Sequence, residues 1–235
     1  MLAAQKGHEA IECLLIMKGA KHDFVTSGGN TIMTMAARDG HYRLVRLLLE
    51  KGVKHDRVNT SGHTALTFAV KNGHEAVVHL LLTCGADPNI NRGHGQTALA
   101  IAAWYGREAM VRVLLSGGAK IDMMNDSGNT ALMWAIRNSC NGIAGLLVAE
   151  GADLDIANKN GETALACAAR YGREAIARLL LMNGAKHDTM SNSGETPLML
   201  ATRFGNDSVV SLLLEHAKRD PEYTIFRSCC FKIPS

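Results

Sequence analysis

Hydrophobic and polar positions alternate along the chain in blocks that return at a fixed interval. Each block begins with a threonine followed by small apolar residues, as in TALAIAA from Thr97, and continues to three large apolar residues, as in Leu80-Leu81-Leu82. A polar, turn-rich stretch such as GADPNINRGHG separates one block from the next. The pattern predicts two short helices per block, with the large apolar run on the buried face of the second helix.

The interval between blocks is 33 residues, with no insertion. A glycine lies two positions before each threonine, an alanine five positions after it, and in most blocks a glycine nine positions after it. Threonine at the start of a helix can cap its free N–H groups, and glycine suits the left-handed residue that ends one. The threonines that set the period are Thr31, Thr64, Thr97, Thr130, Thr163 and Thr196.

The repeated unit, G-x-T-A-L-x-x-A-A-x-x-G with a Leu triplet and a Gly-Ala pair after it, resembles the ankyrin repeat. The resemblance covers residues 1 to about 216. It implies an all-α ankyrin-repeat solenoid of helix-turn-helix units joined by projecting hairpin loops. The structural rivals are a two-layer bundle and a tetratricopeptide array. The latter has 34 residues per unit and no glycine-rich hairpin, which disfavours it.

The repeat also sets the expected domain organisation. We expect residues 1–217 to form the array, as one partial repeat and six repeats, and residues 218–235 to form an irregular or disordered tail. Pro221 ends any helix that enters the tail. Projected backwards, the period places the first threonine before Met1. We therefore expect a segment of a longer array or a truncated gene product; the alternative is that the first unit serves as a rough cap.

One repeat departs from the pattern at a conformationally demanding position. Ser139 stands nine residues after Thr130, where the other full repeats have glycine, and Cys140 follows it. A non-glycine residue held at positive φ costs on the order of 1 kcal/mol. The repeat from Thr130 is therefore predicted to be the weakest inner link of the array.

Composition and charge narrow the class of protein. Hydrophobic residues make up 47% of the chain, charged residues make up 20%, and the formal net charge is +3. This charge is too small to indicate nucleic acid. We find no apolar run of 18 residues, no signal-peptide pattern and no disulfide framework among the six cysteines. The expected setting is intracellular, cytoplasmic or nuclear, without a membrane.

Candidate chemistry is weak throughout. Gly93–Ala98 fits G-x-G-x-x-A, but no long hydrophobic strand precedes it, and its Gly95 and Thr97 belong to the repeat. Histidines recur at equivalent repeat positions (His8, His41, His74) and are expected to be hydrogen-bonded rather than to bind metal, because stacked helices lie too far apart to share an ion. We therefore predict no catalytic residue, cofactor, metal or small-molecule substrate.

The remaining candidate is a protein-binding surface. The family resemblance implies contacts through the hairpin tips and the concave face of the first helices, including the positions seven and eight residues after each repeat threonine (Thr+7 and Thr+8). Aromatic residues and arginine there are of the types enriched in binding hot spots. The predicted binding residues are Arg38, Lys71, Trp104, Tyr105, Arg137, Arg170, Tyr171, Arg203 and Phe204.

The resemblance and these residues together suggest a partner. We expect a protein or peptide with acidic and apolar groups, because arginine can bind carboxylates and aromatic rings can supply buried area. The chain would act as a monomeric adaptor or scaffold. The alternative is a sensor or regulatory arm of a larger multidomain signalling protein or enzyme. The resemblance also suggests one modification, the hydroxylation of Asn89.

Overall fold

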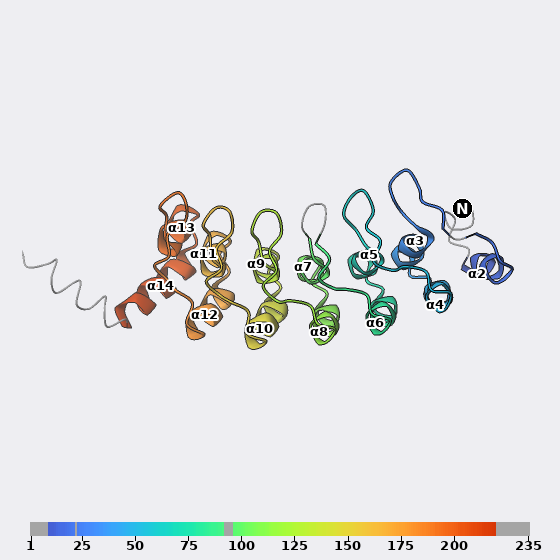
Figure 1. Ribbon diagram of the computed structural model, residues 1–235. Helices are drawn as coiled ribbons and strands as arrows, with labels where there is room; N and C mark the ends of the chain where they lie inside the picture. Colours follow the sequence, from blue (N-terminus) through green and yellow to red (C-terminus); the bar gives the residue numbers. More distant parts are fainter. Residues whose placement is uncertain (1–8, 22, 92–95, 220–235) are drawn as a thin grey trace, which may run out of the picture. The chain divides into compact units, whose positions relative to one another are not determined.

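The computed structural model describes residues 9–21, 23–91 and 96–219, and that part of the chain holds 13 helices (Figure 1). One isolated bridge, between Val25 and Thr31, is the extent of its β-structure. The prediction of an all-α chain built from helix pairs is therefore confirmed. The helix of the last repeat runs to Arg219, and the predicted tail lies from residue 220 onward outside the described residues.

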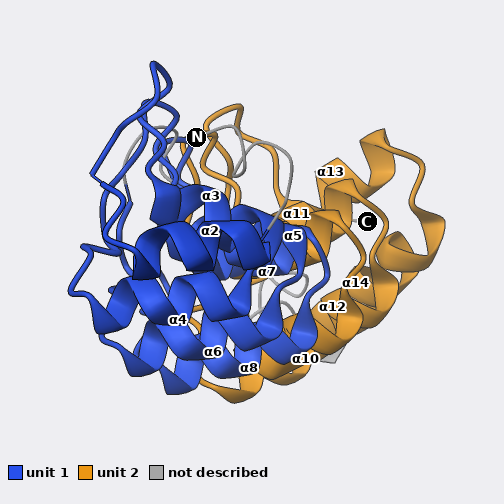
Figure 2. Ribbon diagram, turned by 90° about the vertical axis from the view of Figure 1, so that its right-hand side faces the viewer, with its two compact units in different colours: residues 1–131 blue, residues 132–235 orange. Residues whose placement is uncertain are grey.

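The chain divides into two compact units, residues 1–131 and 132–235 (Figure 2). In unit 1 a single helix is followed by three helix pairs, in which each first helix packs on the next first helix and each second helix on the next second helix. The helices of unit 1 are α2 (Glu9–Met17), α3 (Ile32–Asp39), α4 (Tyr42–Glu50), α5 (Ala65–Asn72), α6 (Glu75–Thr83), α7 (Ala98–Trp104) and α8 (Glu108–Ser116).

Unit 2 has the same two-layer packing. The first helix α11 packs on the next first helix α13, the second helix α10 packs on α12, and α12 packs on α14. Unit 2 opens with α9, which begins at the last residue of unit 1. The helices are α9 (Ala131–Arg137), α10 (Asn141–Ala149), α11 (Ala164–Arg170), α12 (Glu174–Met182), α13 (Pro197–Arg203) and α14 (Asp207–Arg219). We call α3, α5, α7, α9, α11 and α13 the first helices, and in Figure 1 the hairpin loops project beside them.

The repeat threonines start the first helices as predicted. Thr31, Thr64, Thr97, Thr163 and Thr196 are the N-caps of their helices, and each hydroxyl accepts a hydrogen bond from the backbone N–H three residues later. The distance from Thr97 Oγ1 to Ala100 N is 3.2 Å. Each such cap stabilises its helix by about 1 kcal/mol.

A left-handed residue follows each first helix, nine positions after the repeat threonine. Gly40 ends α3 at φ 76° and Gly73 ends α5 at φ 88°. Ser139 takes the equivalent place after α9 with φ 60°, which makes it the one non-glycine residue at positive φ in the described part of the chain. The predicted departure at Ser139 is thus confirmed as a backbone conformation that serine adopts only with strain.

Fewer residues of the second helices are fully buried than the leucine triplets suggest. The middle residue of each triplet is fully buried, whereas its neighbours are half-buried in most repeats. In the first helices other than α13 most residues are buried; α7, for example, is buried from Ala98 to Ala103. The small side chains predicted there leave room for first helices to pack on both sides. The buried triplet residues are Leu48, Leu81, Leu114, Leu147, Leu180 and Leu213.

Consecutive repeats are joined by side chains at the Thr+10 position, which opens the second helix. The His74 ring nitrogen Nε2 lies 2.9 Å from the carbonyl oxygen of Arg38. Asn206 Nδ2 donates to the carbonyls of Ala169 and Arg170 at 2.7 and 3.0 Å. In these repeats, the residue that opens the second helix therefore bonds carbonyl groups at the C-terminal end of the preceding repeat's first helix. The expectation that His74 is hydrogen-bonded within the fold is confirmed.

Candidate functional site

The predicted binding residues lie at the C-terminal ends of the first helices, just where burial stops. Arg38 and Lys71 lie in the last turns of α3 and α5. The other Thr+7 residues are the last residues of their helices, and each aromatic residue at Thr+8 is a C-cap. All nine side chains are exposed or half-buried, although most of the other residues in α3, α5, α7, α9 and α11 are buried.

Unit 1 contributes two adjacent aromatic residues and two basic ones. Trp104 is 37% exposed and Tyr105 45% exposed, at the end of a helix whose other residues are buried. Arg38 is already paired: its Nε and Nη2 donate to the Asp39 carboxylate at 2.8 and 2.9 Å. That hydrogen bond raises the pKa of the Arg38 guanidinium. Lys71 is half-buried and makes no ion pair with any residue that the structure describes.

In unit 2 the structure brings the predicted residues together in cation–π contacts between repeats. The Arg137 guanidinium carbon lies 5.8 Å from the centroid of the Tyr171 ring in the next repeat. The Arg170 carbon lies 4.9 Å from the centroid of the Phe204 ring in the next repeat, and the carbon of Arg203, from the same repeat as Phe204, lies 5.6 Å from that centroid. Each contact of this kind is worth about 0.5–1 kcal/mol at an exposed site.

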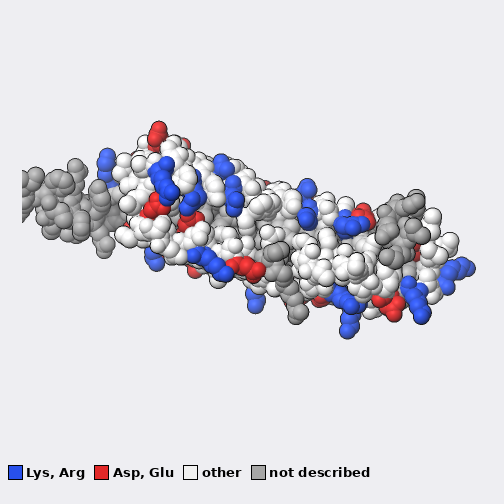
Figure 3. Space-filling view, turned by 90° about the horizontal axis from the view of Figure 1, so that it is seen from above, with Lys and Arg blue, Asp and Glu red and all other residues white. Residues whose placement is uncertain are grey.

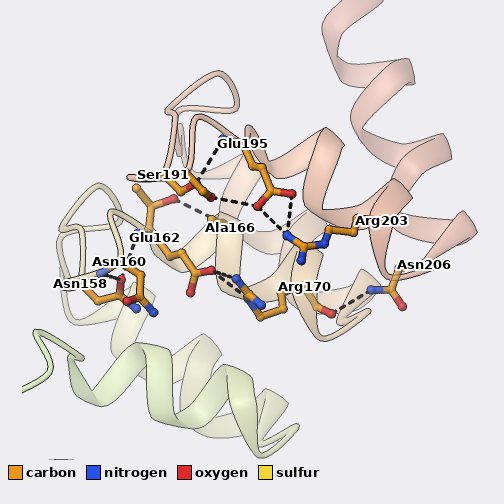
Figure 4. Close-up of polar contacts among 11 residues, drawn as sticks. Asn158, Asn160, Glu162, Ala166, Arg170, Ser191, Glu195, Arg203 and Asn206 are labelled. Atoms are coloured by element: carbon orange, nitrogen blue, oxygen red, sulfur yellow. Dashed lines mark hydrogen bonds and ion pairs between the residues drawn. The ribbon is translucent and has the colours of Figure 1, made fainter.

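Two glutamates hold the arginines in place (Figure 4). Arg170 donates through Nε and Nη2 to one oxygen of Glu162, a carboxylate that is only 5% exposed. Arg203 Nη1 donates to both oxygens of Glu195, at 3.1 and 3.0 Å. Both glutamates stand directly before the repeat threonine, eight residues ahead of their arginine.

The hairpin before α13 orients Glu195 further. Ser193 Oγ donates to Glu195 Oε2 at 2.9 Å, and the Glu195 backbone N–H donates to Ser191 Oγ at 3.2 Å. The Ser193 hydrogen bond, together with the Arg203 guanidinium, lowers the pKa of the Glu195 carboxyl. The carboxylate thus stays ionised at neutral pH and remains a partner for Arg203.

Prediction of this site from sequence missed the anchoring glutamates. The available signal was an acidic residue at Thr−1 combined with arginine at Thr+7, which occurs only in the repeats of Thr163 and Thr196. The arginines therefore do not offer whole guanidinium groups to a partner, since part of each is used within the chain. Basic and acidic side chains are correspondingly interspersed in both units on the face seen in Figure 3.

The histidine and cysteine side chains form no metal site within the part of the chain that the structure describes, and the buried Cys167 thiol is not reactive. No group of three or more His, Cys, Asp or Glu side chains is placed to hold a metal ion in the described ranges. His41 Nδ1 lies 3.2 Å from Glu12 Oε2, so this histidine is paired as expected, while His8 lies outside the described residues. Burial raises the pKa of the Cys167 thiol to about 12, which leaves it protonated and unreactive.

Asn89, the candidate for hydroxylation, is held between two hairpins of unit 1. Its Nδ2 donates to the Gly118 carbonyl at 3.0 Å, and its Oδ1 accepts from the Lys120 backbone N–H at 2.8 Å. The side chain therefore has a structural role of its own. None of the helices within the described ranges has both the length and the apolar character needed to cross a membrane.

Comparison with known proteins agrees with the fold. The family model for ankyrin repeats, which spans three copies, matches residues 1–92, 77–158 and 140–225. A search of curated proteins returned no match. The matched segments cover most of the sequence, and the helix pairs described above repeat at the same 33-residue interval. The chain therefore belongs to the ankyrin-repeat family.

Proposed function

We propose that the chain is a protein-recognition module, an adaptor or scaffold, that binds its partner through the exposed ends of its first helices. Ankyrin-repeat domains are generally protein-binding modules and are typically not catalytic. The observation that carries the proposal is the exposure of Trp104 and Tyr105. These large aromatic side chains stand at the end of a helix whose remaining residues are all buried, and both present a substantial part of their surface to solvent.

The proposed partner is a protein or peptide with apolar and acidic groups. Trp, Tyr and Arg are the side chains most enriched among residues that dominate binding energy. Because Arg38, Arg170 and Arg203 are already paired with carboxylates of the chain, the aromatic rings would supply most of the buried area. The arginines would contribute only their unused N–H groups. Small molecules, nucleic acids and membranes play no part in the proposed function, and the chain would act as a monomer.

The test is affinity capture from cell lysate with matched baits. The first bait is the unaltered chain, and the second carries Trp104→Ala and Tyr105→Ala. The control bait carries Tyr42→Ala, which removes a comparably exposed aromatic side chain, 40% exposed, from the second helix α4 of the same unit. Circular dichroism establishes first that all three are folded.

A protein captured by the unaltered and control baits, but not by the double variant, supports the proposal. It is then purified and titrated against the same three chains by calorimetry, where loss of two central aromatic side chains should weaken binding by about 2–4 kcal/mol. Equal binding to all three chains would place the partner site elsewhere and refute the proposal.

A further inference from the structure

The ring of Phe204 makes cation–π contacts with two guanidinium groups from different repeats. Arg170 reaches it from the end of α11 at 4.9 Å, and Arg203 reaches it from the end of α13 at 5.6 Å. The ring is not enclosed by these contacts, because Phe204 remains 44% exposed. The surface thus combines an accessible apolar ring with two cations at its border.

Both guanidinium groups are fixed before any partner arrives. Arg170 is held by Glu162, whose backbone N–H in turn donates to Asn158 Oδ1 at 3.0 Å. Arg203 is held by Glu195, which also accepts from Ser193. Each arginine is therefore bound at one side by a carboxylate and packed at one face against the ring. A partner would lose little side-chain entropy in binding groups that are already ordered.

Each arginine also keeps unused donors. Arg170 donates through Nε and Nη2, and Arg203 through Nη1, to their glutamates. The Nη1 group of Arg170 and the Nε and Nη2 groups of Arg203 donate to no residue that the structure describes. Guanidinium N–H groups have no acceptor role, so these donors can be satisfied only by water or by an acceptor from a partner.

We propose that Arg170, Phe204 and Arg203 form a docking site for a peptide segment in which a carboxylate side chain stands close to an apolar one. The carboxylate accepts from the unused arginine N–H groups, and the apolar side chain covers the exposed part of the Phe204 ring. This inference rests on the proposed function, and it names one part of the partner's chemistry and the place where that part binds.

The local charge favours a carboxylate over a phosphate. The two arginine charges are balanced by Glu162 and Glu195, so the site has no surplus of positive charge. A phosphate group carries about −1.5 to −2 charges at neutral pH and would be repelled by two nearby carboxylates. A carboxylate needs fewer hydrogen-bond donors than a phosphate group. It carries one negative charge, which is about half to two-thirds of the phosphate charge. Charge-assisted hydrogen bonds from arginine to carboxylate fit this arrangement.

The probe is a phage-displayed library of random 12-residue peptides, selected on the full chain. Enriched peptides are synthesised with a fluorescent label and titrated by anisotropy. We expect them to carry Asp or Glu within a few residues of a large apolar side chain. Arg203→Gln and Phe204→Ala should each weaken binding about tenfold, the effect of losing one charge-assisted hydrogen bond or one aromatic contact. Both side chains are exposed, and circular dichroism verifies that the variants fold.

Arg178→Gln is the matched control. Arg178 is also an exposed arginine of unit 2 in an ion pair, with Glu174 at 3.0 Å, but it lies on the second helix α12. Its loss should leave peptide binding unchanged. An equal loss of affinity in Arg178→Gln and Arg203→Gln would mean that binding follows overall charge, and would overturn the docking site.

A second variant tests the role of the anchoring carboxylate. Glu195→Gln keeps an acceptor for Arg203 but removes a negative charge beside the incoming carboxylate. We expect it to strengthen binding of the acidic peptide about threefold, within the range of exposed charge–charge effects. The same peptide with Asn or Gln in place of its acidic residue should show no gain. A purely structural role for Glu195 would produce no such dependence on the peptide's charge.

The remaining outcomes separate this site from the proposed function. If Trp104→Ala with Tyr105→Ala abolishes binding and the Arg203 and Phe204 variants do not, the protein-recognition proposal stands and the docking site is refuted. If binding survives all of these substitutions, both are refuted. Failure to enrich any peptide, or tighter binding of a phosphoserine version of the peptide, also overturns the docking site.

Discussion

Ser139 concentrates backbone strain at a single residue. It is held at φ 60° in a place where the neighbouring full repeats have glycine, and Gly205 holds φ 69° after α13. Changing Ser139 to glycine should therefore stabilise the protein by on the order of 1 kcal/mol. In thermal unfolding followed by circular dichroism, we expect the midpoint to rise by about 2–4 °C.

The matched control is the reverse change, Gly205→Ser, at a site where an added Cβ meets no atom within 4 Å. Because the site is open, the substitution introduces strain without a clash, and the midpoint should fall by a similar amount. An unchanged midpoint for Ser139→Gly would show that the strain is relieved elsewhere.

Glu195 offers a second prediction at the residue scale. Its carboxyl pKa is lowered chiefly by the Ser193 hydroxyl and then by Arg203. A carboxyl whose pKa is lower in the folded state stabilises that state above its ordinary pKa, and the contribution is lost as pH falls through the folded value. Ser193→Ala should therefore raise the pKa of Glu195 toward that of an ordinary glutamate. Carbon-13 NMR of the carboxyl measures it, with Ser116→Ala in α8 as the control that leaves Glu195 unchanged.

At the scale of helices, stability depends on side chains that donate hydrogen bonds to the last carbonyl groups of a helix in the preceding repeat. Asn206 donates to the carbonyls of Ala169 and Arg170, and Ala169 is fully buried. Asn206→Ala removes both hydrogen bonds: the Ala169 carbonyl keeps only the 3.4 Å bond from the Gly172 N–H, and the Arg170 carbonyl loses its protein donor, which should cost about 1–3 kcal/mol. Urea unfolding followed by circular dichroism measures the change.

Asn183→Ala is the control for this prediction. Asn183, the C-cap of α12, also donates its side-chain amide to a backbone carbonyl, that of Leu179 at 2.8 Å, but it is exposed and the bond stays within its own repeat. Its removal should change stability by less than about 0.5 kcal/mol. Equal effects of the two substitutions would mean that the link between repeats adds nothing beyond a local cap.

The helices also show which parts of the fold can be predicted from sequence. Thr97 acts through its hydroxyl and Gly40 through its own backbone conformation, each within one turn of a helix, so a single repeat contains all the information needed to place them. The pairing of Arg170 with Phe204 depends on how one repeat stacks on the next, and Glu162 is recognised only once its arginine is seen beside it. Contacts between repeats are tertiary, and a pattern along the chain does not record them.

At the scale of the whole molecule, the repeat that carries Ser139 is the first of unit 2. Stability in repeat arrays is approximately a sum of terms for each repeat and each interface, so a weak repeat can divide the unfolding into separate steps. We expect native-state hydrogen exchange in low urea to show α10 opening at a lower free energy than α6 of unit 1 and α12 of unit 2.

Mass spectrometry of peptic fragments resolves the three helices within one sample of the unaltered chain. Ser139→Gly should increase the protection of α10 more than that of α6. If all three helices exchange through one common opening, the array unfolds as a single cooperative unit and Ser139 does not divide it.

The hydrogen bonds between repeats have a consequence for how the protein is made. The His74 bond to Arg38 and the Asn206 bond to Arg170 each span 36 residues, and the ring or amide always comes later in the sequence than the carbonyl. On the ribosome, the ends of α3 and α11 therefore lack these hydrogen bonds until about 36 more residues have emerged, about 2–7 s at ordinary rates of synthesis. At these two places, the helix end of one repeat is completed only when the next repeat has been synthesised.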